Sequence, residues 1–415
     1  MDILYPFARP LYVMTKPAGS RCNMACKYCY YLEKEHLYAK QEGKNDLLMN
    51  DRTLEEFISQ YIAAQTQTDV LFVWHGGEPL MRPLSFYKKV VMLQEKYANG
   101  HRIDNCIQTN GTLLDDKWCA FLAEHHWLVG VSIDGNRGFH DEYRRSKGGM
   151  PTFEKTRRGI ELLKKHGVEW NAMGVVNEYN GDYPLEVYRF YKEIGCQYIQ
   201  FAPIIERICP HPDGRYLATV DDREAKMADF SVKPEQYGEF ICQLFDEWVQ
   251  HDVGTIFVQL FDATLARWVG EQPGICSMAE NCGHAGVLEY NGDLYSCDHF
   301  VSPEHLLGNI HHTPINELMY GEKQRLFGQA KSKSLPQQCK ECEWLFACNG
   351  GCPKDRFAKT ETGEAGLNYL CTAYKQFFSH VAPYMDFMRN ELAHQRPPAN
   401  VMQWIKRQKQ NNATI

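Results

Sequence analysis

Long apolar runs, a leader segment and an excess of positive charge are all missing from this sequence. No stretch of about 18 uninterrupted apolar residues occurs, which argues against a membrane-spanning helix. The opening MDILYPFARPLYV lacks a basic start followed by an apolar core and a small-residue cleavage site, so it is not expected to be a signal peptide. The net charge of -7 gives no reason to expect nucleic acid as a partner. We therefore expect a cytoplasmic protein that binds neither membrane nor nucleic acid.

The chain also lacks low-complexity segments and repeats of roughly 20–50 residues. Its 415 residues are too many for one ordinary domain and suit a barrel with an appended module. Changes of pattern divide the chain into a barrel (1–235), a connecting helical segment (236–270), a cysteine-rich module (271–385) and a C-terminal helix or tail (386–415).

Apolar runs and amphipathic segments alternate between residues 11 and 205. The expected strands are 11–15, 70–74, 106–109, 128–133, 171–176 and 198–201. The expected helices, with apolar residues three and four apart, cover 51–65, 84–98, 115–126, 152–167 and 183–195. Six strand–helix units predict an α/β fold, a partial (β/α)6 TIM-type barrel that does not close fully.

Helix boundaries are marked by capping residues, and one more helix follows the barrel strands. The expected N-caps are Asp51, Ser85 and Asp115 or Asp116, and the expected C-caps are Gly167 and Gly195. A polar, proline-containing connection from 206 to 235 leads to a helix expected over 234–251.

Candidate functional motifs follow the first four expected strands. They are Cys22–Cys29, the GGEP segment 76–79, the QTNG segment 108–111 and the SIDG segment 132–135. Active-site groups of such barrels lie on loops at the carboxyl ends of the strands. The motifs should therefore converge at one end of the barrel.

Sixteen cysteines need an explanation in a reducing cytosol, where clustered cysteines more often bind metal than form disulfides. Eleven fall into clusters, and the other five are expected to be small buried apolar residues. These five are Cys106, Cys119, Cys196, Cys209 and Cys242.

The first cluster is Cys22-x3-Cys26-x2-Cys29, three thiols on one tight loop. They can reach three corners of a [4Fe–4S] cluster, whose full ligation takes four cysteines, so one iron stays open to a small molecule. A zinc site is the alternative, but zinc usually takes four ligands in paired motifs, and no His or Cys completes this loop at the usual spacing.

This loop resembles the radical S-adenosylmethionine superfamily, whose motif is CxxxCxxC with an aromatic residue, here Tyr28, before the third cysteine. The resemblance implies that S-adenosylmethionine binds the open iron and, on reduction, yields a 5'-deoxyadenosyl radical. It further implies that Tyr28 packs against adenine. By the same resemblance Gly77 meets the methionyl group through its backbone, although GGEP read alone could be merely a turn.

Three further cofactor contacts rest on the same resemblance. Ser132 and Arg144 match positions that contact the ribose and carboxylate of S-adenosylmethionine, and Ile205 matches a backbone contact to adenine.

The second module carries eight cysteines, enough for two sites of four ligands, and zinc could fill both. Their spacing resembles the SPASM extension of radical enzymes that modify peptides. That resemblance implies two auxiliary [4Fe–4S] clusters, three clusters in all. It assigns one set of ligands as Cys276, Cys282, Cys297 and Cys352, and the other as Cys339, Cys342, Cys348 and Cys371.

Across nearly the whole chain the sequence resembles the anaerobic sulfatase-maturating enzymes. The segments that carry the resemblance are CNMACKYCYY, HGGEP, IQTNGTL, VSIDG, YIQF, SCDHF and LGNI. It implies oxidation of a Cys or Ser side chain of a sulfatase to Cα-formylglycine. The radical takes a hydrogen from Cβ, a base takes the proton, and an auxiliary cluster takes the electron.

The resemblance makes Asp298 the base, although an Asp in a loop can also merely bond nearby backbone amides. It places Tyr31 near the substrate. His75 stands where relatives can carry Gln, and it is either a substrate contact or a hydrogen-bonded histidine at a strand end.

The implied partners are a sulfatase polypeptide, unfolded or nascent, with a Cys/Ser-x-Pro-x-Arg motif, and an electron donor such as flavodoxin or ferredoxin. Two other readings stay open at this point. One is a peptide maturase that forms a thioether or carbon–carbon crosslink, and the other is a non-catalytic zinc-binding scaffold.

Overall fold

A computed structural model describes residues 10–34, 48–210, 216–218, 222 and 224–412 of the chain. Six parallel strands lie side by side in chain order at its centre, each hydrogen-bonded to the next. They are β1 (Tyr12–Thr15), β2 (Asp69–Trp74), β3 (Arg102–Thr109), β4 (Leu128–Ser132), β5 (Trp170–Val176) and β6 (Tyr198–Pro203). The predicted partial barrel is thereby confirmed.

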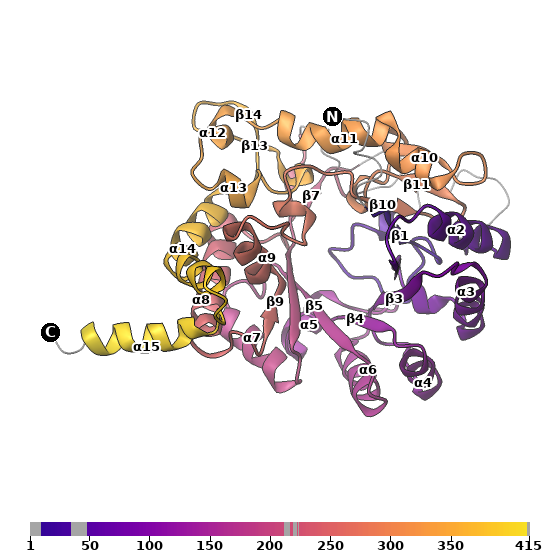
Figure 1. Cartoon of the computed structure of the whole chain (residues 1–415), viewed down its shortest axis with the longest axis horizontal. Helices are drawn as coiled ribbons and strands as arrows, with labels where there is room; N and C mark the ends of the chain where they lie inside the picture. Colours follow the sequence, from indigo (N-terminus) through magenta and orange to yellow (C-terminus); the bar gives the residue numbers. More distant parts are fainter. Residues whose placement is uncertain (1–9, 35–47, 211–215, 219–221, 223, 413–415) are drawn as a thin grey trace.

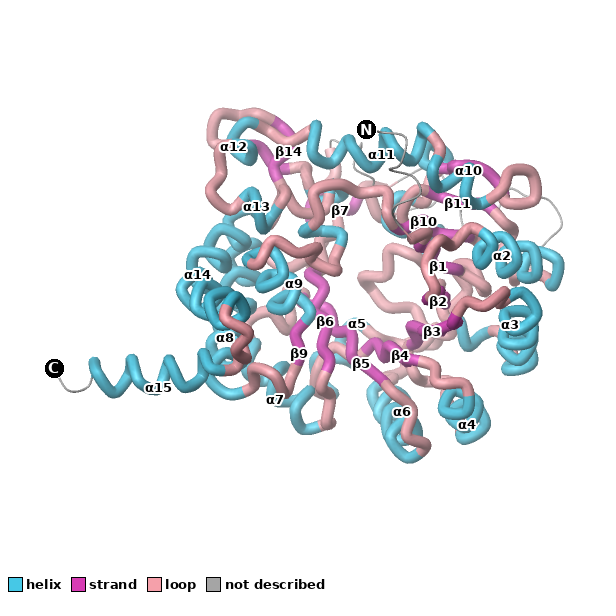
Figure 2. Tube along the Cα trace, viewed as in Figure 1, coloured by secondary structure: helices cyan, strands magenta, loops and turns pink. Residues whose placement is uncertain are grey.

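Helices cover the outside of this curved sheet, as Figure 2 shows. The connections carry α2 (Asp51–Ala63), α3 (Leu84–Tyr97), α4 (Asp116–Glu124), α5 (Arg137–Tyr143), α6 (Phe153–Lys165) and α7 (Pro184–Glu193), with short 3-10 turns η1 (Leu32–Lys34) and η2 (Pro79–Met81). All but α5 and the 3-10 turns match predicted helices.

Two of the predicted N-caps are wrong. Asn50, not Asp51, caps α2, and its side chain accepts a hydrogen bond from Thr53 N at 2.9 Å. Helix α3 starts after Pro83, whose ring fixes φ for a helix entry, so Ser85 lies inside the helix.

The other predicted caps are correct. Asp115 caps α4 by accepting from Trp118 N at 2.8 Å. Gly167 and Gly195 have φ of +66° and +73°, the left-handed conformation that glycine tolerates best after a helix.

Aromatic side chains build the core between β2 and the helices outside it. Trp74 is fully buried, stacks on Trp127, and meets Phe57 and Tyr87 edge to face. Its indole N–H donates to Asn105 Oδ1 at 2.9 Å, so the one polar atom of the ring is satisfied.

The sheet continues beyond the barrel on both sides, which the sequence pattern did not predict. Beyond β6 lies β9 (Phe257–Val258), and beyond β1 lie β10 (Ala285–Leu288), β11 (Asp293–Tyr295) and β12 (Leu306–Asn309), giving ten strands. Strand β10 runs parallel to β1 in a register from Tyr12 opposite Ala285 to Thr15 opposite Leu288. The second module therefore joins the barrel through backbone hydrogen bonds.

The remaining elements surround this sheet. They are β7 (Arg207–Ile208), β8 (Lys226–Met227), α8 (Pro234–His251), α9 (Gln259–Trp268), η3 (Cys276–Met278), η4 (Asp298–Phe300), η5 (Pro303–His305), α10 (Ile315–Tyr320), α11 (Glu322–Lys333), α12 (Gln337–Lys340), α13 (Leu345–Cys348), η6 (Pro353–Asp355), β13 (Ala358–Lys359), β14 (Ala365–Leu367), α14 (Cys371–Ala393) and α15 (Asn400–Asn412). Helix α8 has the predicted bounds.

Helix α14 packs on α8 and α9, and α15 extends from that side of the molecule (Figure 1). The expected division at residue 385 falls inside α14. None of the helices formed by the described residues combines the length and apolar character that a membrane span needs.

Candidate active site

The loop of residues 16–31, directly after β1, carries the first three clustered cysteines. Backbone hydrogen bonds fix it to the segment that follows α5: Ala25 N donates to Arg145 O at 2.8 Å, and Lys27 N donates to Tyr143 O at 3.1 Å. The loop is thus held as a defined structure although it contains no regular secondary structure of its own.

The three thiols of this loop lie within electrostatic range of one another. The pKa of Cys22 and that of Cys26 are raised to about 12. Burial is the largest cause, and the negative charge of Cys29 acts in the same direction. Burial also raises the pKa of Cys29, while backbone N–H groups of Tyr31 and Leu32 favour its thiolate. Iron binds the thiolate form of cysteine, and N–H groups near the sulfurs tune the reduction potential of a cluster. This donor set therefore fits an iron–sulfur cluster.

The GGEP segment packs directly on the cysteine loop. Gly77 N donates to Gly19 O at 2.8 Å, and Glu78 N donates to Arg21 O at 2.8 Å. A side chain at position 77 would place its Cβ 2.2 Å from the Arg21 carbonyl oxygen, so glycine is required by the close backbone approach.

Glu78 makes GGEP more than a turn. Its buried carboxylate accepts hydrogen bonds from Thr109 Oγ1 at 2.7 Å, Asn110 N at 2.8 Å and Leu80 N at 3.0 Å. Burial raises its pKa to about 7, and these donors oppose that rise. The carboxylate thereby ties the ends of β2 and β3 together beneath the cysteine loop.

A second buried carboxylate holds the other side of the loop. Asp134, directly after β4, accepts from the Tyr28 hydroxyl and forms an ion pair with Arg144 Nε at 2.9 Å. The Arg144 guanidinium carbon lies 5.5 Å from the centre of the Tyr28 ring. Two residues predicted to contact the cofactor are therefore joined by Asp134, a residue whose role the sequence did not reveal.

Ser132 and Ile205 lie at the carboxyl ends of two barrel strands: Ser132 is the last residue of β4, and Ile205 lies two residues after β6. Ser132 Oγ accepts from Gln108 Nε2 at 3.0 Å. Ile205, just after β6, is buried, and its carbonyl accepts from Lys354 Nζ at 2.9 Å. Lys354 belongs to the second module, so the two modules meet at this point.

Asp298 contacts two residues of the loop after β1, and one of them, Lys16, is linked to His75 directly after β2. Its Oδ1 lies 2.6 Å from Lys16 Nζ, and its Oδ2 accepts from the Tyr30 hydroxyl at 2.5 Å. Lys16 Nζ also lies 3.1 Å from Nδ1 of His75. The carboxylate is mostly buried, with 17% of its side chain exposed, while the Lys16 side chain is fully buried.

These contacts determine the charge states around Asp298. Burial alone would raise the pKa of Asp298, but the Lys16 ammonium holds it below its ordinary value. Burial and Lys16 lower the pKa of His75 to about 3, so the imidazole is neutral. Because an ammonium group only donates, Nδ1 of His75 is the acceptor. Asp298 is therefore an ionised carboxylate.

Tyr31 and Tyr30 have different surroundings. Tyr31 is buried, its hydroxyl donates to Glu289, and its ring centre lies 4.1 Å from Lys16 Nζ. Tyr30 is the neighbour whose hydroxyl reaches Asp298. Sequence reasoning singled out Tyr31 and missed Lys16, Tyr30 and Glu289. A lysine at the end of a buried strand was the available indication, since a buried ammonium needs a partner.

Four cysteines of the second module form one group around Cys276. Burial is the largest cause that raises the pKa of Cys352, to about 12, and the pKa values of Cys282 and Cys297. The negative charge of Cys276 acts in the same direction on all three. The N–H groups of His299 and Lys354 favour the thiolates of Cys297 and Cys352.

The other four form a second group around Cys342. Burial is the largest cause that raises the pKa of Cys348, to about 12, and the pKa values of Cys339 and Cys371. The negative charge of Cys342 acts in the same direction on all three. These electrostatic neighbours are the same cysteines that the SPASM resemblance puts in each set, and the two ligand sets stay a prediction.

No three His, Cys, Asp or Glu side chains among the described residues converge closely enough to hold a single metal ion. An iron–sulfur cluster does not require that convergence, because each cysteine bonds to a different iron. Outside the groups, Cys119, Cys196 and Cys242 are buried as predicted, whereas Cys106 and Cys209 are half-buried.

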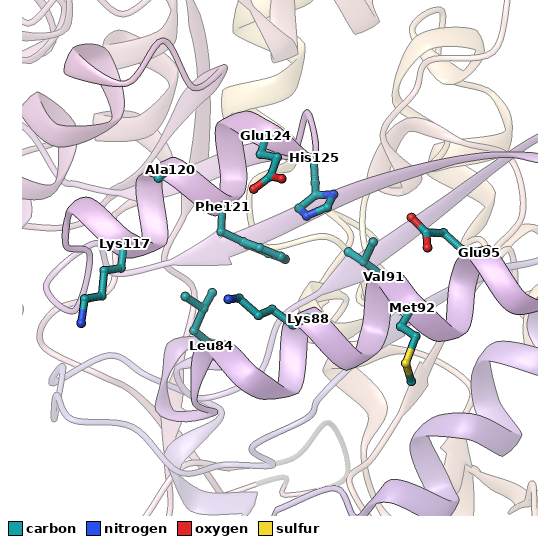
Figure 3. A pocket seen from close by; sticks show the side chains of 10 residues that line it. All are labelled: Leu84, Lys88, Val91, Met92, Glu95, Lys117, Ala120, Phe121, Glu124 and His125. Atoms are coloured by element: carbon teal, nitrogen blue, oxygen red, sulfur yellow. The ribbon is translucent and has the colours of Figure 1, made fainter.

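A separate pocket lies on the outer surface between α3 and α4 (Figure 3). Its volume is about 520 Å³, and helix side chains such as Leu84, Lys88, Phe121 and His125 line it. It contains none of the predicted site residues.

Comparison with known proteins identifies the family. Residues 17–191 match the Radical SAM superfamily, and residues 280–343 match SPASM, an iron–sulfur cluster-binding domain. A serine-type anaerobic sulfatase-maturating enzyme of Bacteroides thetaiotaomicron is 63% identical over 402 residues, covering 97% of this chain and 96% of that protein. The chain belongs to the anaerobic sulfatase-maturating enzymes.

Other anaerobic sulfatase-maturating enzymes match over similar lengths. A cysteine-type enzyme of Clostridium perfringens is 32% identical over 92% of this chain and 99% of its own. A solved structure described as native anSMEcpe with bound AdoMet and Cp18Cys peptide has a TM-score of 0.80 at 31% identity, covering 92% of this chain and 99% of that one. The family matches confirm the predicted classes of cofactor, [4Fe–4S] clusters and S-adenosylmethionine, and leave no support for a zinc scaffold.

Proposed function

We propose that this chain oxidises a serine side chain of a sulfatase polypeptide to Cα-formylglycine. The similarity to sulfatase-maturating enzymes extends over nearly the full length, and the serine-type relatives of Bacteroides thetaiotaomicron and Klebsiella aerogenes are 63% and 36% identical. The structural observation that supports the proposal best is Asp298, an ionised carboxylate beside the cluster ligand Cys297 and held by Lys16.

The proposed ligand sets follow the spatial groups of thiols. Cys22, Cys26 and Cys29 hold the first cluster and leave one iron for S-adenosylmethionine, and the two groups of the second module hold two auxiliary clusters, three in all. When bound, these cofactors supply a 5'-deoxyadenosyl radical that removes a Cβ hydrogen and an acceptor for the remaining electron. The protein must position the side chain that reacts and move one proton.

The proposed cofactor contacts lie on the loops around the cysteine loop. Gly77 offers its backbone, Ser132 and Arg144 offer polar groups, and Tyr28 and Ile205 face the adenine. Arg144 is already held by Asp134, so its guanidinium is fixed in position before any ligand binds. A pre-positioned cation costs less to order on binding than a free one.

Asp298 is the proposed proton acceptor for the hydroxyl of the target serine. Its ion pair with Lys16 keeps it ionised, and its bond to Tyr30 fixes the second oxygen. General bases contribute roughly 10²–10⁴-fold to such reactions. His75 is the proposed hydrogen-bond partner that aims the Lys16 ammonium at Asp298, and Tyr31 supports Lys16 from the other side, so neither needs to touch substrate itself.

The proposed substrate is an extended segment with a Ser-x-Pro-x-Arg or Cys-x-Pro-x-Arg motif in an unfolded or nascent sulfatase. An extended segment can enter a barrel end that a folded domain cannot. The proposed electron donor is a flavodoxin or ferredoxin.

The test is anaerobic incubation of the reduced protein with S-adenosylmethionine and either of two peptides that differ only in Ser or Cys. The expected result is 5'-deoxyadenosine together with a mass loss that corresponds to the aldehyde, faster on the Ser peptide. A crosslinked product without aldehyde would favour the crosslinking maturase instead. Deoxyadenosine without any modified peptide would contradict the proposed function and leave the radical class intact.

A further inference from the structure

Two cations, the buried Lys331 and the half-buried Arg356, lie among the cysteines of the second module. Lys331, at the end of α11, is only 1% exposed. Its ammonium donates to the carbonyls of Cys276 at 2.8 Å, Ser277 at 2.9 Å and Ala279. It therefore sits inside the turn that presents Cys276, a member of the first group of thiols.

Arg356 binds backbone that lies between a cysteine of each group. Its guanidinium donates to the carbonyls of Asn349 at 2.9 Å, Gly350 at 2.9 Å and Lys331 at 2.5 Å. Residues 349 and 350 separate Cys348 of the second group from Cys352 of the first. A side chain at position 350 would lie 2.6 Å from Arg356 Nη2, so the glycine makes room for the cation.

The cysteines that act most on the charge of each cation agree with these hydrogen bonds. Burial lowers the pKa of Arg356, and thiols of both groups, Cys339 and Cys348 on one side and Cys282 and Cys352 on the other, oppose that change. Burial also lowers the pKa of Lys331, but the thiols that oppose it belong to the first group alone.

Neither cation is neutralised by a carboxylate among the residues that the structure describes. Their hydrogen bonds go to backbone carbonyls, with one Ser334 hydroxyl at 3.5 Å from Arg356. Lys354, two residues after Cys352, differs: its ammonium pairs with Asp355 at 2.7 Å and Glu206 at 3.6 Å. The positive charges of Lys331 and Arg356 therefore act on the thiolate sites with little compensation.

We propose that Arg356 and Lys331 set the reduction potentials of the auxiliary clusters, with Arg356 raising both and Lys331 raising only that of the first group. The inference rests on the ligand sets of the proposed function. A cluster gains negative charge on reduction, and a nearby cation that no carboxylate neutralises stabilises the reduced form. The two cations thus make both sites better electron acceptors. The effect is larger on the first group, because both cations act on it, whereas Arg356 alone acts on the second.

The experiment measures midpoint potentials by EPR-monitored redox titration of the full-length chain. The first cluster is removed by replacing Cys22, Cys26 and Cys29 with Ala, and each remaining signal is assigned by its loss in Cys282→Ala or Cys342→Ala. Arg356→Gln should lower both midpoint potentials by at least about 59 mV. For one electron this is a tenfold change in the reduction equilibrium constant. Lys331→Gln should lower only the signal that Cys282→Ala removes.

Matched variants control for folding and for loss of any lysine. Lys333→Gln removes an exposed lysine two residues along the same helix and should leave both midpoints unchanged. Arg356→Lys keeps the positive charge but changes the hydrogen bonds, and its midpoint potentials should stay near those of the parent protein. This variant therefore distinguishes the effect of the charge from that of the hydrogen bonds. Iron content and circular dichroism check that each variant is loaded and folded, and Lys331→Gln alone tests the selective shift if Arg356→Gln does not load.

Unchanged midpoints in loaded Arg356→Gln and Lys331→Gln would overturn the inference while the ligand sets stand. Equal shifts of both signals in Lys331→Gln would overturn the selectivity. Fewer than two auxiliary signals in the parent protein would overturn the ligand sets themselves, and with them this proposal.

Discussion

Cations at the barrel end and in the second module have different kinds of partner. At the barrel, Lys16 is paired with Asp298 and Arg144 with Asp134. In the second module, Lys331 and Arg356 bind backbone carbonyls. A paired cation fixes the position and charge of a carboxylate, whereas an unpaired cation projects its charge onto neighbouring thiolates. We therefore propose that the first region serves proton transfer and the second electron transfer.

The largest effect is expected where a carboxylate of the barrel end is neutralised. Asp298→Asn keeps the shape but cannot accept the substrate proton, so formation of the aldehyde should fall by roughly 10²–10⁴-fold. Cleavage of S-adenosylmethionine should continue, because it precedes proton transfer. Mass spectrometry of peptide and deoxyadenosine measures both, and exposed Asp386→Asn is the control. Equal loss of both products would contradict the assignment.

Removing the cation of that pair should cost stability as well as activity. Lys16→Met leaves the Asp298 carboxylate mostly buried without its ion-pair partner, a loss of about 3–5 kcal/mol. Since Lys16 holds the pKa of Asp298 low, its removal should also raise that pKa and shift the acid limb of the rate profile to higher pH.

Anaerobic denaturation and rates across about pH 5–9 test this prediction. Lys16→Arg retains the charge and serves as the control. An unchanged acid limb in Lys16→Met would show that the ion pair does not govern the protonation of Asp298.

Two adjacent tyrosines allow a sharper test of the same region. Tyr30→Phe removes a hydrogen bond to a charged carboxylate, worth about 1.5–3 kcal/mol, and should reduce kcat by tenfold or more. Tyr31→Phe removes the donor to Glu289 and should lower the free energy of unfolding with little change in kcat. Paired kinetic and unfolding measurements distinguish them, and the reverse outcome would place Tyr31 rather than Tyr30 at the substrate.

The smallest expected effect concerns Glu289. Burial raises its pKa to about 7 in the folded protein, above the ordinary value of 4.5. Its contribution to stability is therefore full below the unfolded pKa and is lost as pH rises through the folded one. Between pH 6 and pH 8 that loss amounts to about 1 kcal/mol. Glu289→Gln should remove this part of the pH dependence, measured by denaturant unfolding at both pH values.

The barrel was predictable because its pattern is local. Each strand is a short apolar run and each helix an amphipathic segment, and these features are set within about 15 residues. Helix starts were less certain, because Asn50 and Asp51 have equal capping ability and only the extended chain at Met49, bonded to Pro17 O, decides between them. The cysteine loop was predictable for the same reason, since Cys22, Cys26 and Cys29 lie in one short segment.

The surroundings of Asp298 were not predictable because they combine distant residues. Lys16 and Asp298 are separated by more than half the chain, and the pairing of β1 with β10 brings them together. Nothing in the local pattern of either segment specifies its partner. The grouping of the eight later cysteines was available only from family resemblance, because Cys352 joins a different group from Cys348 four residues earlier.

The pairing of β1 with β10 also bears on the order in which the chain acquires its structure. During synthesis β1 emerges first, yet one of its two edges stays open until residues 285–288 have been made. An open edge of this kind invites pairing with other chains. A fragment that ends after the barrel should therefore self-associate.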